Sequence, residues 1–178
     1  MSGEQRDEIE LRPWAEGDFW LMERLLGDPA MMVHLGGPES PEKLRDRHER
    51  YCRIGESGTG RMFVIVVGPE RVAAGSIGYW EREERGKQVW ETGWSVLPEF
   101  QGRGIATRAT VAAAVRAREE GKHRFMHAYP SVENGPSNAI CRKAGFALVG
   151  EFEFEYPVGQ MMRCNDWVLD LGAGVPLD

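Results

Sequence analysis

A glycine-bearing turn between a strand and a helix is the stretch whose residue types most directly indicate chemistry. Residues 88–97 have the aromatic and β-branched content of a strand, and residues 105–120 have the alanine-rich composition of a helix. Pro98 ends the strand because proline cannot donate to a strand ladder. In the turn, Gly102 and Gly104 allow backbone conformations closed to other residues and leave no Cβ between the amides and a ligand. Because the helix dipole adds positive potential, the turn predicts an anion site, with phosphate as the preferred ligand.

Two well-known phosphate loops do not fit this turn. A P-loop requires Gly-Lys-Ser/Thr after four intervening residues, and a dinucleotide fingerprint requires a third glycine where Thr107 stands. What remains is the pattern Gln101-x-x-Gly104-x-Ala106. A Gly-x-Gly turn also occurs simply to pack a helix close to a sheet, so the turn by itself leaves both interpretations open.

Length and composition describe one globular domain over residues 1–178, with 42% hydrophobic and 28% charged residues. The three cysteines, Cys52, Cys141 and Cys164, are odd in number and widely separated, which argues against a disulfide framework or a zinc site and favours a reducing cytoplasm. The net charge of −6 disfavours general nucleic-acid binding. No apolar run approaches the ~18 residues of a membrane span, so we expect a cytoplasmic protein without a membrane or nucleic-acid partner.

The order of the predicted elements indicates a mixed α+β domain. Helices are expected from Asp18 to about Leu26, from Pro41 to about Ile54, over residues 105–120 and from Pro136 to Ala144. Strands are expected over residues 8–13, 62–67, 72–80, 88–97, 124–129, 151–156 and 163–171, with residues 81–87 as a charged hairpin tip. Residues 151–156 alternate strictly between acidic and aromatic side chains, which is typical of a half-exposed strand.

A second motif adds specificity to the first. Residues 134–146 read Asn-Gly-Pro-Ser-Asn-Ala-Ile-Cys-Arg-Lys-Ala-Gly-Phe and follow the Gln101-x-x-Gly104-x-Ala106 pattern by about thirty residues. Together the two motifs resemble the GNAT superfamily of N-acetyltransferases. Within it, residues 90–104 are similar to the strand and loop of the ribosomal-protein N-terminal acetyltransferases. The resemblance is strong over residues 91–146 and consistent in element order over nearly all of the chain.

The resemblance implies a central, partly splayed, mostly antiparallel mixed sheet flanked by helices, with acetyl-coenzyme A as the cofactor. It also implies a set of contacts with that cofactor. The expected contacts are Val96 and Leu97 beside the pantetheine arm, Gln101, Gly102, Arg103, Gly104, Ile105, Ala106 and Thr107 around the pyrophosphate, the side-chain amide of Asn134, and Ser137, Asn138 and Arg142 nearby.

Acetylation of an amine by a thioester needs a neutral amine close to the carbonyl and a group that takes up the proton. Glu91 is the first candidate for this base, because strand alternation places it on one face with Gly93 and Ser95. The alternative is an exposed strand glutamate paired with a cation. Ser95 is a candidate hydrogen-bond donor near the thioester, or an ordinary strand serine.

Many GNAT enzymes have a tyrosine, acting as general acid, four residues before the glycine that ends the second-motif helix. Here that position is Cys141. Cys141 is thus the candidate acid, but packing beneath Phe146 is the preferred interpretation if Gly145 ends the helix. His127 and Tyr129 are fallback acid–base groups.

Three classes of function remain at this point. The leading one is an acetyl-CoA-dependent N-acetyltransferase acting on a primary amine, either a protein N-terminal α-amine or a small amine, by direct attack in a ternary complex. The second is a catalytically weak acyl-CoA-binding or sensor protein of the same fold, and the third is a protein that binds another nucleotide. A homodimer is an open expectation, and the sequence does not separate peptide, polyamine and aminoglycoside acceptors.

Overall fold

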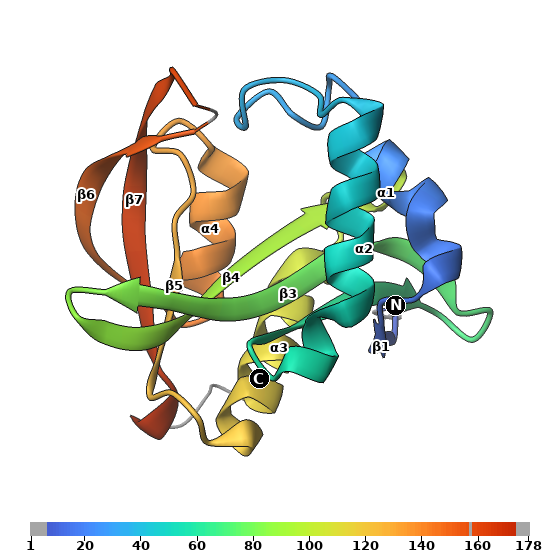
Figure 1. Cartoon of the computed structure of the whole chain (residues 1–178). Helices are drawn as coiled ribbons and strands as arrows, with labels where there is room; N and C mark the ends of the chain where they lie inside the picture. Colours follow the sequence, from blue (N-terminus) through green and yellow to red (C-terminus); the bar gives the residue numbers. More distant parts are fainter. Residues whose placement is uncertain (1–6, 157, 174–178) are drawn as a thin grey trace, which may run out of the picture.

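Seven strands form one sheet in the order β1-β2-β3-β4-β5-β7-β6 in the computed structural model, which describes residues 7–156 and 158–173 (Figure 1). The strands are β1 (Ile9–Pro13), β2 (Gly60–Val67), β3 (Val72–Glu84), β4 (Lys87–Val96), β5 (Phe125–Ala128), β6 (Ala147–Glu155) and β7 (Met161–Asp170). The α-helices are α1 (Phe19–Leu26), α2 (Pro41–Ser57), α3 (Ile105–Glu120) and α4 (Gly135–Lys143). The expected α+β class with a mixed, mostly antiparallel sheet is confirmed.

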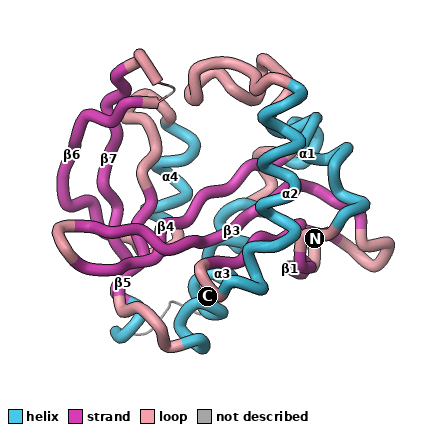
Figure 2. Tube along the Cα trace, in the orientation of Figure 1, coloured by secondary structure: helices cyan, strands magenta, loops and turns pink. Residues whose placement is uncertain are grey.

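The sheet opens between its two central strands. Every strand pair is antiparallel except β4 and β5, which run parallel and pair only at Trp90↔Met126 and Glu91↔His127. The five residues of β4 that follow Glu91 have no partner on β5, so the two strands diverge (Figure 2). This divergence is the splay that the family resemblance implies.

The helices cover the two faces of the sheet with separate apolar cores. On one face, α3 packs its buried alanines at 109, 113 and 117 against Tyr79, Trp90 and Met126. Small side chains let the helix approach the strands closely. On the other face, α1 contributes Leu21 and Leu25 to a core with β2. Figure 1 shows α1 and α2 on the face opposite α3.

Local sequence signals account for the element boundaries. Ser40 caps α2 by accepting a hydrogen bond from the Lys43 N–H at 3.3 Å, and Pro41 occupies the first helical position. The hairpin tip expected over residues 81–87 is wrong: β3 and β4 continue to a two-residue turn at Arg85-Gly86, whose φ values are 50° and 76°. A turn with two positive φ angles matches the twist of the strands, so the charged residues flanking it stay in the ladder.

The strand expected at residues 151–156 is longer than its alternating segment. The strand β6 begins at Ala147, and a register irregularity lies between Leu148 and Gly150. Pairing with β7 extends the strand through this glycine, which sequence pattern alone marks as an interruption.

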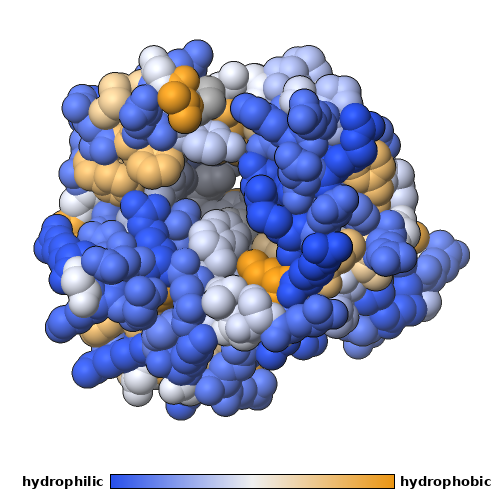
Figure 3. Space-filling model, in the orientation of Figure 1, coloured by the Kyte–Doolittle hydropathy of each residue, from blue (hydrophilic) through white to orange (hydrophobic). Residues whose placement is uncertain are grey.

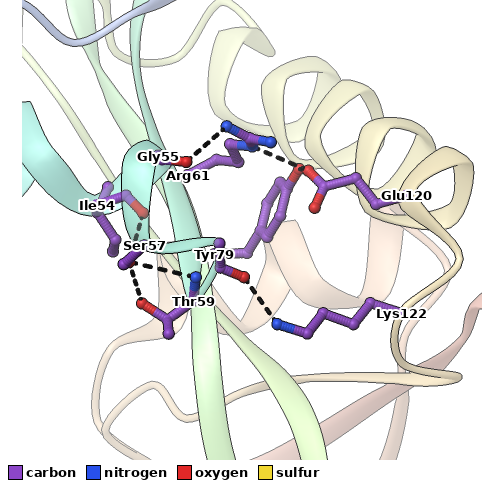
Figure 4. A network of polar contacts seen from close by, with 9 residues as sticks. Ile54, Gly55, Ser57, Thr59, Arg61, Tyr79, Glu120 and Lys122 are labelled. Atoms are coloured by element: carbon purple, nitrogen blue, oxygen red, sulfur yellow. Dashed lines mark hydrogen bonds and ion pairs between the residues drawn. The ribbon is translucent and has the colours of Figure 1, made fainter.

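A polar network ties the end of α3 to the sheet (Figure 4). The buried Tyr79 donates its hydroxyl hydrogen bond to the Glu120 carboxylate, and Arg61 pairs with the same carboxylate at 3.2 Å while donating to the Gly55 carbonyl at 3.2 Å. Burial and the bond to Glu120 together raise the pKa of Tyr79. The network therefore joins β2, β3, α3 and the end of α2.

Replacing Tyr79 with phenylalanine is expected to lower the free energy of unfolding by ~1–2 kcal/mol, because the partly buried Glu120 loses one donor and keeps Arg61. Urea denaturation of the wild type and Tyr79→Phe would measure the loss. The same substitution in a Glu120→Ala background should cost clearly less. An equal cost in both backgrounds would mean that the hydroxyl contributes nothing through Glu120.

Among the described residues, no helix is long and apolar enough to span a membrane.

Candidate active site

The turn before α3 presents a cluster of backbone N–H groups without acceptors. Gly102 and Gly104 have φ angles of 74° and 70°, as their expected role requires, and Gly104 is the N-cap of α3. The first helical hydrogen bond runs from the Arg108 N–H to the Gly104 carbonyl at 3.1 Å. Within the described part of the chain, no N–H from residue 102 to residue 107 donates to a protein acceptor. A Cβ added at either glycine would meet nothing within 4 Å. An open amide cluster at the N-terminus of a sixteen-residue helix fits a phosphate group.

The side chain of Arg103 already has partners within the protein. It forms an ion pair with Asp7, and its guanidinium carbon lies 5.4 Å from the centroid of the Phe100 ring. Arg108 donates to the Asp7 carbonyl, which holds this segment against the turn. Contact of Arg103 with a phosphate would have to replace its pairing with Asp7, whereas the backbone amides of the turn are open.

The main chain at the end of β4 offers hydrogen-bonding groups to the opening between β4 and β5. The Leu97 N–H donates to the Ala74 carbonyl at 2.8 Å, so it belongs to the sheet. Antiparallel pairing alternates, and the backbone groups of Trp94 and Val96 therefore point away from β3, toward the opening. The Val96 carbonyl accepts from the Gln101 side chain at 2.9 Å. Val96 and Leu97 are the two expected pantetheine contacts. The Val96 N–H faces the opening, whereas the Leu97 N–H is bonded to the Ala74 carbonyl.

The start of α4 borders the same opening. Asn134 caps the helix by accepting from the Ser137 N–H at 3.1 Å, and the side chains of both residues line a cavity beside β4. Asn138 was expected near the cofactor, but its side-chain amide already makes hydrogen bonds within the protein. It donates to the Ser131 and Asn134 carbonyls and accepts from Asn165 and Trp167 at 2.7 and 2.8 Å. Asn138 is therefore a structural link between α4 and β7. Arg142 at the last turn of α4 stacks 5.6 Å from the centroid of the Trp167 ring.

The cavity has a volume of about 350 Å³ and lies over β3 and β4, between α2 and the β6–β7 hairpin. Figure 3 shows the hollow on this face of the molecule. The β3–β4 register is continuous, so Glu91, Gly93 and Ser95 share one face as expected, and all three line the cavity. A Cβ at Gly93 would lie 3.1 Å from the Trp80 ring. The glycine thus leaves room for the indole to cross the strand.

Glu91 combines the two alternatives that the sequence leaves open. It lines the cavity with 22% of its side chain exposed, and it accepts a hydrogen bond from Arg82 Nη1 at 3.0 Å. Burial by itself would lower the pKa of Arg82, but the hydrogen bond to Glu91 and the attraction of nearby acidic groups together outweigh burial, so the pKa is raised. The guanidinium also lies 4.3 Å from the centroid of the Tyr129 ring. Glu91 is therefore a positioned carboxylate facing the cavity.

Sequence reasoning missed Arg82, because it fell in the segment interpreted as a hairpin tip. The available signal was the two-residue alternation with Trp80, which places Arg82 on the same strand face if β3 continues. Sequence reasoning also missed the acidic–basic pair Glu39 and Arg47 and the aromatic side chains of β6, which come from elements far apart in the chain.

The fallback groups lie close to one another, His127 on β5 and Tyr129 directly after it. His127 Nδ1 is 2.7 Å from the Asp166 carboxylate, and its ring stacks on Tyr129 with 5.6 Å between centroids. Tyr129 lines the cavity and donates to Glu84 at 3.1 Å, whereas His127 is buried behind it. Burial is the main cause that raises the pKa of Tyr129, and this holds the phenol neutral.

Cys141 lies in the core and does not line the cavity. This location supports the interpretation of Cys141 as a packing residue over its role as a candidate acid. Its side chain is fully buried in one cluster with Phe146, and burial raises the pKa of the thiol to about 12. The Phe146 N–H bonds to the Cys141 carbonyl at 3.0 Å and the Gly145 N–H to the Arg142 carbonyl at 3.2 Å. These two bonds form the helix-ending Schellman motif expected from Gly145.

Truncating Cys141 to alanine should lower the free energy of unfolding by ~1 kcal/mol and leave turnover nearly intact, because the thiol only fills space. Differential scanning fluorimetry and steady-state kinetics on the same preparation would separate the two effects. A large fall in turnover at an unchanged melting temperature would identify Cys141 as a proton donor instead.

The fold and this site together define a class of protein. The sheet opens between two parallel strands, with a cluster of open amides at the start of α3 and a cavity beside β4, and this arrangement fits a transferase that uses an acyl-CoA. The model of the acetyltransferase (GNAT) domain family matches residues 8–147, so the chain belongs to this family. It is a GNAT acetyltransferase domain, and acetyl-CoA is the co-substrate.

Solved structures agree with this assignment at the level of the fold. The chain is similar to the RimL ribosomal L7/L12 α-N-protein acetyltransferase in complex with coenzyme A, with 24% identity, a TM-score of 0.77, and coverage of 91% of this chain and 93% of that one. It is similar to the spermidine N-acetyltransferase of Vibrio cholerae in complex with coenzyme A and spermine (19% identity, TM-score 0.76, 92% and 96% covered). It is also similar to an aminoglycoside acetyltransferase in complex with coenzyme A (16% identity, TM-score 0.72, 93% and 96% covered). A comparison with curated proteins found no significant match.

Proposed function

We propose that this chain transfers the acetyl group of acetyl-CoA to a primary amine, either a protein N-terminal α-amine or a small amine, by direct attack in a ternary complex. The observation that carries the proposal is that Glu91 and the cavity lie directly beside the point where β4 and β5 separate. The similar solved proteins are named for action on a protein N-terminus, on spermidine and on aminoglycosides, and all three acceptors carry amines.

The cofactor residues of this proposal follow from the free groups of the site. The N–H groups of residues 102–107 would hold the pyrophosphate, and the main chain at Trp94 and Val96 would bond to the pantetheine arm as an added strand does. Asn134 would contribute the free half of its side-chain amide. Acetyl-CoA supplies the activated acyl group when bound.

The chemical roles follow from the cavity face of β4. The amine nitrogen attacks the thioester carbonyl, a C–N bond forms and the C–S bond breaks. Glu91 accepts the proton of the amine directly or through a water, and the departing thiolate takes a proton from solvent. Ser95 lies on the same face of β4, four residues after Glu91, and is positioned to donate a hydrogen bond near the thioester. Holding both reactants in one cavity supplies much of the acceleration.

A second candidate function is a catalytically weak acyl-CoA-binding protein. It is favoured by the buried cysteine at the position of the family's tyrosine and by the pairing of Glu91 with Arg82. Both observations leave the site without an obvious unpaired acid–base group.

Two measurements test the proposed function. Thermal shift should show stabilisation by coenzyme A but not by ATP or NAD, since a protein that uses the cradle for another nucleotide would respond in the opposite order. Release of free thiol from acetyl-CoA during a screen of primary amines should then reveal turnover. Binding of coenzyme A without thiol release from any amine would favour the second candidate.

A further inference from the structure

The charged groups that line the cavity are already paired with one another. Its acidic side chains, among the described residues, are Glu39 and Glu91. Glu91 bonds to Arg82, and Glu39, with 9% of its side chain exposed, accepts from Arg47 Nε at 3.0 Å. For Arg47 too, burial would lower the pKa, but its contacts with Glu39 and Tyr51 outweigh this and raise it. Within the part of the chain that the structure describes, the cavity thus contains two ion pairs and no uncompensated carboxylate.

This pairing disfavours an acceptor with several positive charges. Each ammonium group loses its hydrating water on entering the cavity. Unpaired carboxylates or carbonyls must replace the lost hydrogen bonds. A polyamine or an aminoglycoside would have to compete with Arg82 and Arg47 for the same two carboxylates. The proposed function assigns a position to the reacting amine alone, beside Glu91, and the other ammonium groups of such an acceptor would have none.

The rest of the wall is aromatic. Phe152 and Phe154 on β6 and Tyr156 directly after it line the cavity, whereas the acidic residues that alternate with them do not. The three rings form a continuous series with Tyr129, with centroid distances of 5.1 Å from Tyr129 to Phe152, 6.3 Å from Phe152 to Phe154 and 6.2 Å from Phe154 to Tyr156. The series runs from Arg82, which lies over both Tyr129 and Phe154, to the Tyr156 hydroxyl near Glu39.

The opposite side of the cavity continues this surface. Trp80 crosses the strand over Gly93, and Tyr51 on α2 and Met62 on β2 line the cavity beside it. Aromatic rings bury large apolar area at little entropic cost and stack on flat ligands. A volume of about 350 Å³ lies at the small end of ligand pockets, which run from ~300 to 1,000 Å³.

We propose that the acceptor is a primary amine carried on an aromatic or large apolar group, with its amine at Glu91 and its body along the Tyr129–Phe152–Phe154–Tyr156 wall. This inference rests on the proposed function for the position of the reacting amine. Two sources share this chemistry: a free arylalkylamine, and a polypeptide whose first residue is aromatic.

The test compares acceptors by thiol release and by binding, each with a control whose amine is of the same kind, because alkylamines and peptide α-amines differ in pKa. Phenethylamine, tryptamine and the dipeptide amide Phe-Ala-NH₂ are compared with spermidine, kanamycin and Gly-Ala-NH₂. The aromatic acceptors should show kcat/KM values ~10–100-fold higher, the range expected for burying one aromatic group. The source is the acceptor with the larger gain over its own control, either phenethylamine over spermidine or Phe-Ala-NH₂ over Gly-Ala-NH₂.

Isothermal titration calorimetry in the presence of coenzyme A separates this inference from the proposed function. Binding of the aromatic amines without turnover of any amine would support the aromatic acceptor site and overturn the transferase proposal. Efficient turnover of spermidine or kanamycin, at or above the aromatic amines, would overturn the inference and keep the transferase. Absence of both binding and turnover for the aromatic amines would also overturn the inference.

Two variants test the charge argument directly. Arg47→Gln removes the cationic partner of Glu39 and should lower the KM for spermidine ~10-fold, because the carboxylate can then bind the second ammonium. Glu39→Gln in the same background should remove this gain. If Arg47→Gln binds spermidine no better than the wild type while its melting temperature shows it folded, ion pairing does not exclude polycations.

A further pair of variants tests the aromatic wall. Phe154→Ala should raise the KM for phenethylamine ~10-fold with little change in kcat, because Phe154 lines the cavity and is proposed to contact the body of the acceptor and not its amine. Glu153→Ala, at the next position of the same strand but on its solvent face, is the matched control and should have no effect. Equal changes in the two variants would overturn the placement of the acceptor on this wall.

Discussion

Replacing Glu91 with glutamine is expected to lower kcat by ~10²–10⁴-fold, the usual contribution of a general base. Glu91 is the carboxylate on the cavity face of β4 at the point where β5 diverges. The attacking amine arrives mostly protonated near neutral pH, and glutamine retains the shape of the side chain but cannot accept a proton. Coenzyme A affinity should hardly change, because the cofactor groups proposed for β4 are backbone groups of Trp94 and Val96.

The pH dependence makes this prediction specific. The loss should shrink as the pH rises, because more of the amine is already neutral and needs no base. Glu81→Gln is a suitable control. Glu81 lies on the neighbouring strand β3, pairs with Lys122 and His123, and does not line the cavity. If Glu91→Gln retains most of its kcat between about pH 6 and pH 9, positioning with bulk water accounts for the rate.

Substituting valine for Gly104 is expected to abolish coenzyme A binding. At φ 70° the residue is in the left-handed region, and a Cβ added there would meet nothing within 4 Å. The valine would both strain this conformation and cover the amides that are proposed to hold the pyrophosphate. Isothermal titration calorimetry with coenzyme A on the folded variant measures the loss.

The other end of α3 supplies a matched control. Gly121 ends the helix at φ 65°, and a Cβ there also meets nothing within 4 Å. Gly121→Val therefore imposes a similar backbone strain on the same helix, away from the turn, and should leave coenzyme A affinity intact. Arg103→Ala should weaken binding only modestly, because Arg103 already pairs with Asp7. Equal losses from Gly104→Val and Arg103→Ala would mean that the side chain carries phosphate recognition.

The order of strands and helices was predictable because their signals are local. Pro41 at the start of a helix, Gly145 at the end of another and the alternation of residues 151–156 each depend on a few neighbouring residues. The positive φ angles at Gly102 and Gly104 follow from the same kind of local reasoning. Boundaries failed where pairing between strands extends an element beyond its local pattern, as at the Arg85-Gly86 turn.

The sequence by itself determined the family and the open glycine turn before α3, since both depend on short motifs whose geometry is set within one turn of backbone. Tertiary structure alone decided which groups surround the acceptor. Arg82 reaches Glu91 only because β3 and β4 pair in one continuous register, and Glu39, Arg47 and the β6 aromatics meet across more than a hundred residues of chain. The packing of α4 on β7 likewise decided the role of Asn138, whose side chain accepts hydrogen bonds from Asn165 and Trp167. Such contacts depend on how the elements pack, and sequence spacing does not encode them.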